Sequence, residues 1–340
     1  MTVTLPVFEL PADLEASSPP VRRDHVRLLV ADARGVQHTR FARLGEFLEP
    51  GDLVVVNTSG TLSAAVDGTR TDGSRVTVHF STALDDGDWV VEVRPARRAT
   101  GPVGDLREGE TLQLLHGVSL LARGPHPVTQ TRLWRAQIGV EGGVAAYLAR
   151  FGRPIRYPHV RGRYSGAAYQ TVFAREQGSA EMPSAARPFT AELVTDLVTR
   201  GVTMAPITLH GGVSSQEAGE PPQPERFRVP EATARLTNMT RAWGNRVVAV
   251  GTTVTRALES AADADGVVRA CSGWTELVLG PGRPARVVQG LVTGWHAPGA
   301  SHLGLLQAVA GTDLVHRAYE EALRERYRWH EFGDSCLLLP

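Results

Sequence analysis

The stretch 246–260 constrains the fold of this chain more than any other part of the sequence. It begins with the apolar run Val247–Val250, whose β-branched residues predict a buried strand. Gly251 interrupts the run, and Thr252 or Thr253 can cap the helix that the following residues predict. A strand that enters a helix in this way gathers unpaired backbone N–H groups and the positive end of the helix dipole at one point, which suits a carboxylate or a phosphate.

Two charged residues lie on this predicted helix. Arg256 and Glu259 are three positions apart, so they share one face near its start. The simplest interpretation is an ordinary buried strand, a capped helix and a solvated ion pair. The alternative hypothesis is a binding site in which Gly251, Thr252 and Thr253 hold an anionic ligand while Arg256 and Glu259 order their surroundings.

Length and composition are typical of a globular protein with one large domain or two. The 340 residues are 42% hydrophobic and 21% charged, and the formal net charge is zero. A nucleic-acid-binding protein often has a basic excess, which this chain lacks overall, although a local arginine patch could still serve. The sequence contains no lysine, so a lysine Schiff base is excluded.

Cysteine usage and hydropathy indicate the compartment. Cys271 and Cys336 form no spaced pair, which favours a reducing environment. The sequence shows neither an N-terminal apolar signal region nor an apolar run long enough to span a bilayer. We therefore expect a soluble cytoplasmic protein without a membrane partner.

The pattern of predicted elements changes twice along the chain. From 67 to about 150, short alternating strands separated by Gly, Asp and Pro turns predict a small antiparallel barrel, followed by a helix over 144–151. The flanking parts predict α/β structure, with strands at 26–31, 53–56, 202–209, 266–274, 276–279 and 287–292 and helices at 191–200, 230–243, 301–310 and 312–327. A single α/β domain with a long hairpin excursion would explain the same pattern.

Several motifs occur in a fixed order along the chain, and they are specific together although no single one is. They lie at 27–30, 50–58, 169–174, 202–210, 246–260 and 327–334. On these residues the chain resembles the S-adenosylmethionine:tRNA ribosyltransferase-isomerase family of queuosine biosynthesis. The resemblance implies a mixed-sheet α/β main domain made of residues 1–66 and 151–340, with an inserted small antiparallel β-barrel domain made of residues 67–150.

The resemblance also implies a reaction and its ligands. The ribosyl moiety of S-adenosylmethionine would be transferred to a deazaguanine in tRNA and rearranged, with release of adenine and methionine. This chemistry needs a base that removes the C5′ proton acidified by the sulfonium, assistance for adenine departure, and a grip on the methionine end. S-adenosylmethionine would be the substrate, and positioning and fixed charges would supply the catalysis without a metal.

Two histidines in the family motifs, together with Glu259, are the candidate catalytic residues. His210 follows the predicted strand 202–209 and could act as a general base near neutral pH, although a lone histidine at a strand end also has an ordinary structural explanation. His296 precedes a predicted helix. With His302 it could suggest a metal, yet the spacing matches no standard site and no carboxylate is close in the sequence, so we expect none.

The segment 169–171 is the candidate binding site for the adenine of S-adenosylmethionine. The ring of Tyr169 could stack on adenine and Gln170 could hydrogen-bond to it, while Thr171 belongs to the same motif. A strand with one buried aromatic residue would explain these residues without a ligand.

The chain departs from the family pattern in its loops. The two arginines that the family carries after the strand 53–56 are absent from 57–66, and the histidine-rich segment of the family is replaced by 225–230. Three functions therefore remain open: the ribosyltransferase-isomerase acting on tRNA, a paralogue that uses S-adenosylmethionine or a related nucleoside on a small-molecule acceptor in a transferase or lyase reaction, and a non-catalytic nucleoside-binding protein. The zero net charge and altered loops favour the second, whereas the unbroken order of motifs favours the first, which is our primary hypothesis.

Overall fold

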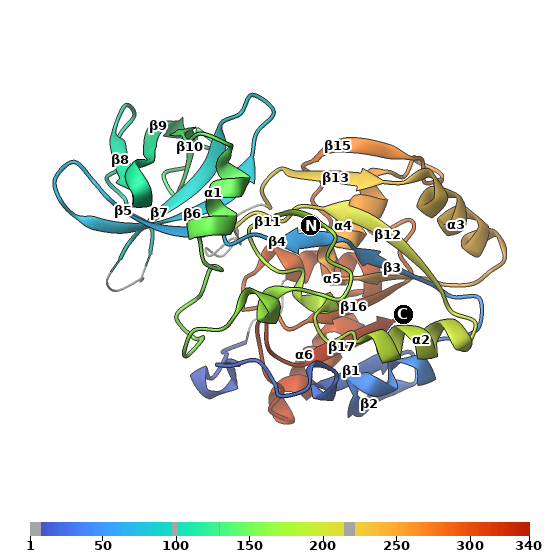
Figure 1. The fold of residues 1–340 in the computed structure, drawn as a ribbon. Coiled ribbons are helices and arrows are strands. Elements are labelled where there is room, and N and C mark those ends of the chain that lie inside the picture. Colours follow the sequence, from blue (N-terminus) through green and yellow to red (C-terminus); the bar gives the residue numbers. More distant parts are fainter. Residues whose placement is uncertain (1–7, 97–100, 129, 214–221) are drawn as a thin grey trace.

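A mixed sheet forms the centre of the main domain, and a separate barrel projects from it (Figure 1). The computed structural model describes residues 8–96, 101–128, 130–213 and 222–340. Within these residues the large sheet has nine strands. In sheet order they are β15 (Cys271–Thr275), β13 (Glu225–Val229), β12 (Thr203–Leu209), β3 (Leu53–Asn57), β14 (Val247–Val250), β16 (Gly290–Gly294), β17 (Ser335–Leu339), β1 (Arg27–Asp32) and β2 (Gly35–Arg40).

The four strands β12, β3, β14 and β16 form a parallel core, and the outer strands include antiparallel pairs. Side chains of β3 alternate between the two faces. Leu53 and Val55 join one buried cluster, whereas Val54 and Val56 join another. Both faces are covered, which explains why a central strand such as β3 is apolar at every position from 53 to 56.

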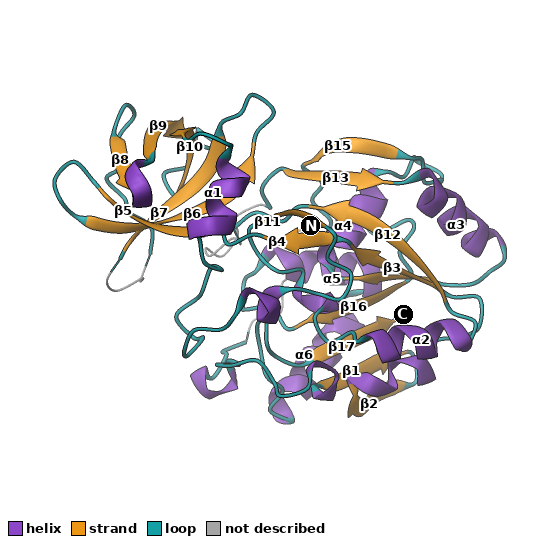
Figure 2. Cartoon of the chain, viewed as in Figure 1, coloured by secondary structure: helices purple, strands orange, loops and turns teal. Residues whose placement is uncertain are grey.

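Helices cover the two faces of the sheet (Figure 2). The first cluster contains side chains of α3 (Glu231–Ala242), α4 (Thr252–Ser260), α5 (Ser301–Ala310) and α6 (Thr312–Arg324). The second contains side chains of α2 (Ala191–Thr199) and of the 3-10 helix Phe41–Glu46. Each fully buried leucine or valine stabilises the fold by about 1.5–3 kcal/mol relative to an exposed one. None of the helices in the described ranges combines the length and the hydropathy of a membrane-spanning segment.

Six described strands close into an antiparallel barrel with its own core. In barrel order they are β10 (Leu133–Gly139), β7 (Trp89–Pro95), β6 (Arg75–Ala83), β5 (Ala65–Thr69), β8 (Thr111–Leu114) and β9 (Ser119–Pro125). Helix α1 (Val144–Phe151) packs Tyr147 and Leu148 against this core. The predicted fold class, a mixed-sheet α/β domain with a small antiparallel barrel, is confirmed. The first barrel strand starts at Ala65, slightly before the predicted boundary at residue 67.

Some predicted elements differ from the structure. Residues 276–279 form no strand, and the predicted strand 266–274 is reduced to β15. The sequence analysis does not predict the strands β2 and β17. It does not predict β13 either, which lies in the segment 225–230 that stands in place of the family's histidine-rich motif. The residues 211–224 are rich in Gly, Ser, Pro and Glu, which predicts an exposed loop, and part of this stretch lies outside the described residues.

Gly152 lies at the junction between the barrel and the main domain, where the backbone is closely packed. A Cβ atom added at Gly152 would lie 1.9 Å from the carbonyl oxygen of Ser63 and 2.6 Å from that of Leu148. Because both atoms belong to the backbone, Gly152→Ala should lower the free energy of unfolding by about 1–3 kcal/mol. The control is Gly104→Ala, where nothing lies within 4 Å of the new atom. Equal urea midpoints for the two variants would contradict this packing.

Candidate active site

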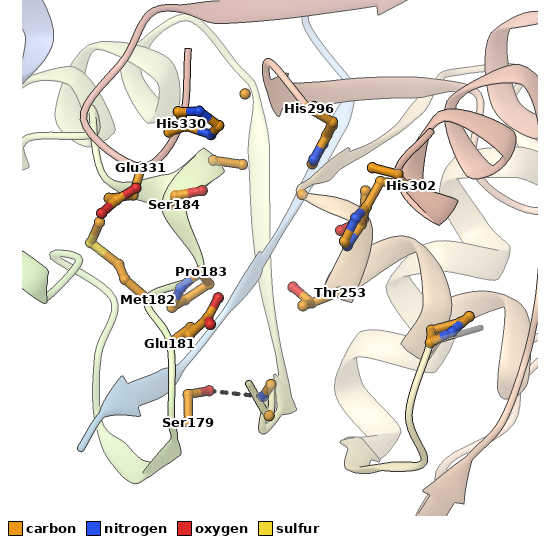
Figure 3. A pocket seen from close by; sticks show the side chains of 18 of the residues that line it. Ser179, Glu181, Met182, Pro183, Ser184, Thr253, His296, His302, His330 and Glu331 are labelled. Atoms are coloured by element: carbon orange, nitrogen blue, oxygen red, sulfur yellow. Dashed lines mark hydrogen bonds between the residues drawn. The ribbon is translucent and has the colours of Figure 1, made fainter. Parts of the chain in front are cut away.

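A cavity of about 590 Å³ lies at the carboxyl ends of the four parallel strands (Figure 3). Its lining includes Asn57 at the end of β3, Gly211 after β12, Thr252 after β14 and Thr293 at the end of β16. Open α/β sheets bind ligands at this edge, and the volume falls in the range typical of small-molecule sites. The predicted strand-to-helix site at 251–253 therefore faces the main cavity.

Helix α4 presents an open N-terminus to this cavity. Gly251 occupies the cap position with φ 96° and ψ 160°, a conformation that essentially only glycine adopts. The prediction that Thr252 or Thr253 caps the helix is wrong, since the cap residue has no side chain and makes no side-chain cap bond. The first N–H groups of an α-helix have no acceptor within the helix, so those of Thr252 and Thr253 are available to an anionic group in the cavity.

The buried side chain of Asn57 fixes the position of this helix start. Its Oδ1 accepts hydrogen bonds from the backbone N–H groups of Ser59 and Leu209, both at 3.0 Å. Its Nδ2 donates to the carbonyl of Leu209 at 2.8 Å and to Thr253 Oγ1 at 3.3 Å. One carboxamide thus joins the ends of β3 and β12 to the first turn of α4.

Arg256 lines the cavity, but its guanidinium is held by other parts of the protein. Nε donates to the carbonyl of Leu277 at 3.1 Å, Nη2 donates to the carbonyls of Thr275 (3.2 Å) and Gln223 (3.3 Å), and Nη1 forms an ion pair with Glu225. Burial raises the pKa of Glu225, and the adjacent arginine opposes this rise. Arg256 therefore ties α4 to β13 and to the segment after β15.

Glu259 lies outside the residues that line the cavity. Its carboxylate accepts hydrogen bonds from the backbone N–H groups of Arg286, Val287 and Val288 at 2.9, 2.9 and 3.0 Å. Glu259 and Arg256 share a helix but bind different partners, so the structure does not contain the ion pair that the simplest sequence interpretation implied. Glu259 anchors the chain that leads into β16.

His296 lines the cavity, and its ring is hydrogen-bonded to Thr293. The Thr293 hydroxyl, which has a single proton, lies 3.1 Å from the carbonyl oxygen of Gly294 and 3.1 Å from His296 Nε2. We assign the hydroxyl proton to the Gly294 carbonyl and a proton on Nε2 to the hydroxyl oxygen, and in this tautomer the lone pair lies on Nδ1. Burial, with a contribution from His302 and His330, holds the pKa of His296 well below its usual range. A neutral imidazole of this kind can accept a proton.

The ring of His302 stacks on that of His296, with centroids 4.6 Å apart and planes 9° apart. Burial, assisted by the positive charge of Arg256, lowers the pKa of His302 to about 4. Both rings line the cavity beside Thr253 (Figure 3). This wall of the cavity is therefore uncharged at neutral pH.

A second histidine pair lies in the cavity wall. The rings of His159 and His330 stack with centroids 4.3 Å apart and planes inclined by 21°. His330 Nε2 lies 3.2 Å from Glu15 Oε1, and His159 Nε2 lies 3.0 Å from Glu331 Oε2. Ligand atoms of Glu15, His159 and His330 lie within 4.8 Å of one another. Lone pairs of stacked rings point in nearly parallel directions, however, so one ion cannot lie in both ring planes at bonding distance.

His210 lies outside the cavity lining, in a second depression with Arg226 and Trp274. A chain of short hydrogen bonds connects it to the cavity. His210 Nδ1 lies 2.7 Å from Ser59 Oγ, which lies 2.6 Å from Ser179 Oγ, and Ser179 lines the cavity (Figure 3). Burial lowers the pKa of His210. His210 is therefore connected to the cavity through the hydroxyl groups of Ser59 and Ser179.

The segment 169–171 is only partly directed at the cavity. Tyr169 lines it, and its ring packs edge-on against Phe332 at 5.3 Å between centroids. Gln170 uses its amide on the backbone of Thr61, accepting at 3.0 Å and donating at 2.7 Å. Thr171 is buried and accepts from the backbone N–H of Phe173. Gln170 therefore positions β4 (Ser59–Thr61), Thr171 stabilises its own turn, and Tyr169 remains the candidate for contact with a base.

Sequence reasoning did not identify several residues of the site. Asn57 had a detectable signal, since a polar residue ends an apolar strand at a sheet edge. The others depend on contacts between loops far apart in the sequence and carry no local pattern: they are Ser59, Ser179, Thr293, His159, His330 and Glu331.

Fold and cavity together define an α/β protein with a cavity of small-molecule size at the strand ends and a barrel domain. The family model described as "Queuosine biosynthesis protein" matches residues 6–338, and the chain belongs to this family. It is 37% identical to the S-adenosylmethionine:tRNA ribosyltransferase-isomerase of Symbiobacterium thermophilum and 33% identical to that of Natranaerobius thermophilus, with 98% and 97% of each chain covered. A crystal structure of S-adenosylmethionine tRNA ribosyltransferase from Thermotoga maritima is similar to it, with a TM-score of 0.55, 29% identity and coverage of 98% and 99%.

The buried ion pair of Arg256 and Glu225 gives a stability prediction. Arg256→Ala leaves a buried carboxylate without its cation and should cost about 3–5 kcal/mol of unfolding free energy in urea titrations. Adding Glu225→Gln should recover part of the loss, because no uncompensated charge remains. Arg235→Ala, at an exposed ion pair on α3, is the control and should leave stability nearly unchanged. A double variant no more stable than Arg256→Ala would contradict this assignment.

The depressed pKa of His302 gives a pH prediction. Below about pH 6.5 the unfolded chain protonates this imidazole more readily than the folded protein does. Stability should therefore fall as the pH is lowered from about 6.5 towards 4, by up to about 3 kcal/mol from this residue. His302→Gln should flatten that part of the profile in thermal unfolding, while His296 keeps a residual slope in the same direction. An unchanged profile in the variant would count against the assignment.

Proposed function

We propose that this protein transfers and rearranges the ribosyl moiety of S-adenosylmethionine onto a deazaguanine in tRNA, releasing adenine and methionine. The observation that carries the proposal is the cavity in which the open N-terminus of α4 faces the neutral His296–His302 wall. Similarity over nearly the whole length to tRNA ribosyltransferase-isomerases supports tRNA as the acceptor over a small molecule. Since the acceptor is tRNA, we place the reaction in the cytoplasm.

The charges that line the cavity suit a sulfonium nucleoside. Its lining includes the carboxylates Glu15, Glu181 and Glu331, whereas Arg256, the one arginine among the described lining residues, is already paired with Glu225. Such a surface attracts the sulfonium and ammonium cations of S-adenosylmethionine and disfavours the polyanionic phosphates of nucleotides. The first N–H groups of α4 then provide the local site for the methionine carboxylate.

Individual residues take distinct roles in the proposed reaction. Nδ1 of His296 removes the C5′ proton, since the assigned tautomer has its lone pair there and the lowered pKa keeps the imidazole unprotonated at neutral pH. The backbone of Gly251, Thr252 and Thr253 holds the carboxylate, and Tyr169 contributes a ring to the adenine side. His210 exchanges protons with the cavity through Ser59 and Ser179.

Three predicted site residues act by positioning others. Arg256 and Glu259 hold the ends of α4 and the entry to β16, and Gln170 holds β4 against the cavity. None of these needs to contact the ligand. The reaction proceeds through positioning and fixed charges, and the proposal assigns no step to a metal.

The test combines calorimetry with single-turnover release of adenine in the presence of tRNA that carries the deazaguanine. His296→Gln should lower the rate about 10²–10⁴-fold with little change in the dissociation constant for S-adenosylmethionine. Thr253→Ala should weaken binding several-fold, since it removes the hydroxyl that Asn57 orients. Thr199→Ala, at an exposed position of α2, is the control.

The outcomes separate the parts of the proposal. Wild-type protein that releases no adenine with S-adenosylmethionine and tRNA would contradict the function. Release at the wild-type rate by His296→Gln would remove only the assignment of the base. Release without any tRNA would point instead to a small-molecule acceptor or to a lyase reaction.

A further inference from the structure

One region of this neutral chain carries a concentrated positive charge. Residues 142–175 contain no aspartate or glutamate and six arginines, although the whole chain has 36 basic and 36 acidic residues. The arginines are Arg150, Arg153, Arg156, Arg161, Arg163 and Arg175. Five of them fall within residues 150–163, which we call the arginine segment. The zero net charge of the whole chain therefore does not exclude a local positive patch, and this region forms one.

Four arginines of this segment lack an acidic partner among the described residues, although Arg156 Nη1 donates to the carbonyl of Gly162 at 2.8 Å and the Arg150 guanidinium lies over the ring of Phe151. Arg150, Arg156, Arg161 and Arg163 are exposed, and among the described residues none of them has a carboxylate within salt-bridge distance. Arg153 is the exception, since it pairs with Asp67 of the barrel. Elsewhere the exposed arginines Arg200, at the C-cap of α2, and Arg235, on α3, pair with acidic residues four positions earlier in the sequence.

The segment is ordered and lies at the rim of the cavity. It leaves α1 and runs from the barrel to the main domain (Figure 1). Backbone bonds from Arg161 N–H to the carbonyl of Ser17 (2.8 Å) and from Arg153 N–H to that of Ala65 (3.0 Å) attach it to both domains. Residues 155 and 157–159 of the segment line the cavity. An anion bound to these arginines would therefore sit next to the reaction space.

Stacked rings lead from the arginine segment into the cavity. The ring of Tyr157 stacks on that of His159, with centroids 6.1 Å apart and planes inclined by 15°, and His159 stacks in turn on His330. Flat rings beside exposed arginines are the combination that proteins use to bind unpaired nucleotides, in which the phosphates meet the cations and the bases meet the rings.

We propose that the arginine segment is the docking surface for RNA, and that it guides one base of the acceptor along the Tyr157–His159–His330 rings into the cavity. This inference rests on the proposed function, because it takes tRNA as the acceptor. It assigns backbone contacts to Arg150, Arg156, Arg161 and Arg163, which position the RNA without reading its sequence. The carboxylates inside the cavity repel phosphate, so the backbone stays at the rim while the base enters.

The experiment compares two triple variants of the full chain with equal charge change. The first is Arg156→Gln/Arg161→Gln/Arg163→Gln, and the control is Arg200→Gln/Arg235→Gln/Arg269→Gln, whose arginines are exposed and paired with acids outside the segment. Binding of a fluorescein-labelled tRNA transcript is measured by anisotropy at several salt concentrations. Calorimetry with S-adenosylmethionine and thermal unfolding test for an intact cavity and fold.

The first variant should bind tRNA at least ~10-fold more weakly, and the slope of log affinity against log salt should fall by about 2–3. Its affinity for S-adenosylmethionine and its unfolding midpoint should match those of the wild type. Equal weakening in both variants, or in neither, would overturn the docking surface while leaving the function intact. A wild-type protein that neither binds tRNA nor releases adenine with it would overturn the function as well.

Discussion

The buried carboxamide of Asn57 is the interaction on which the rest of the site depends. It is fully enclosed, and its four hydrogen bonds join the ends of two parallel strands to the first turn of α4. Gly251 then turns the chain in a conformation that no other residue adopts easily, which leaves the helix without a capping side chain. An open helix start held this rigidly is a preorganised anion site, because binding requires no rearrangement of its donors.

Opposite charges are kept apart within the cavity. Negative side chains line one part, the neutral His296–His302 pair lines another, and the helix N-terminus supplies a local positive potential. Arg256 is the only arginine that lines the described part of the cavity, and Glu225 neutralises its charge. S-adenosylmethionine matches this distribution, because its carboxylate suits the helix N-terminus and its ammonium and sulfonium cations suit the negative side chains. The positive arginine segment lies outside, where the acceptor would arrive.

The sequence predicted those parts of the structure that local patterns encode. The strand β14, the break at Gly251 and helix α4 were predicted closely because apolar periodicity and one glycine specify them. The partners of Arg256 and Glu259 were not predictable, since Glu225 and the backbone of 286–288 reach them only through tertiary packing. His159 and His330 belong to irregular loops without periodicity, so neither their stacking nor their place in the cavity had a sequence signal.

The most direct test of this account is a crystal structure of the protein with bound S-adenosylmethionine. The account predicts that the methionine carboxylate lies within hydrogen-bonding distance of the backbone N–H groups of Thr252 and Thr253, with the C5′ carbon facing Nδ1 of His296. A ligand bound in the depression around His210 and Trp274, or reversed so that adenine occupies the start of α4, would contradict it.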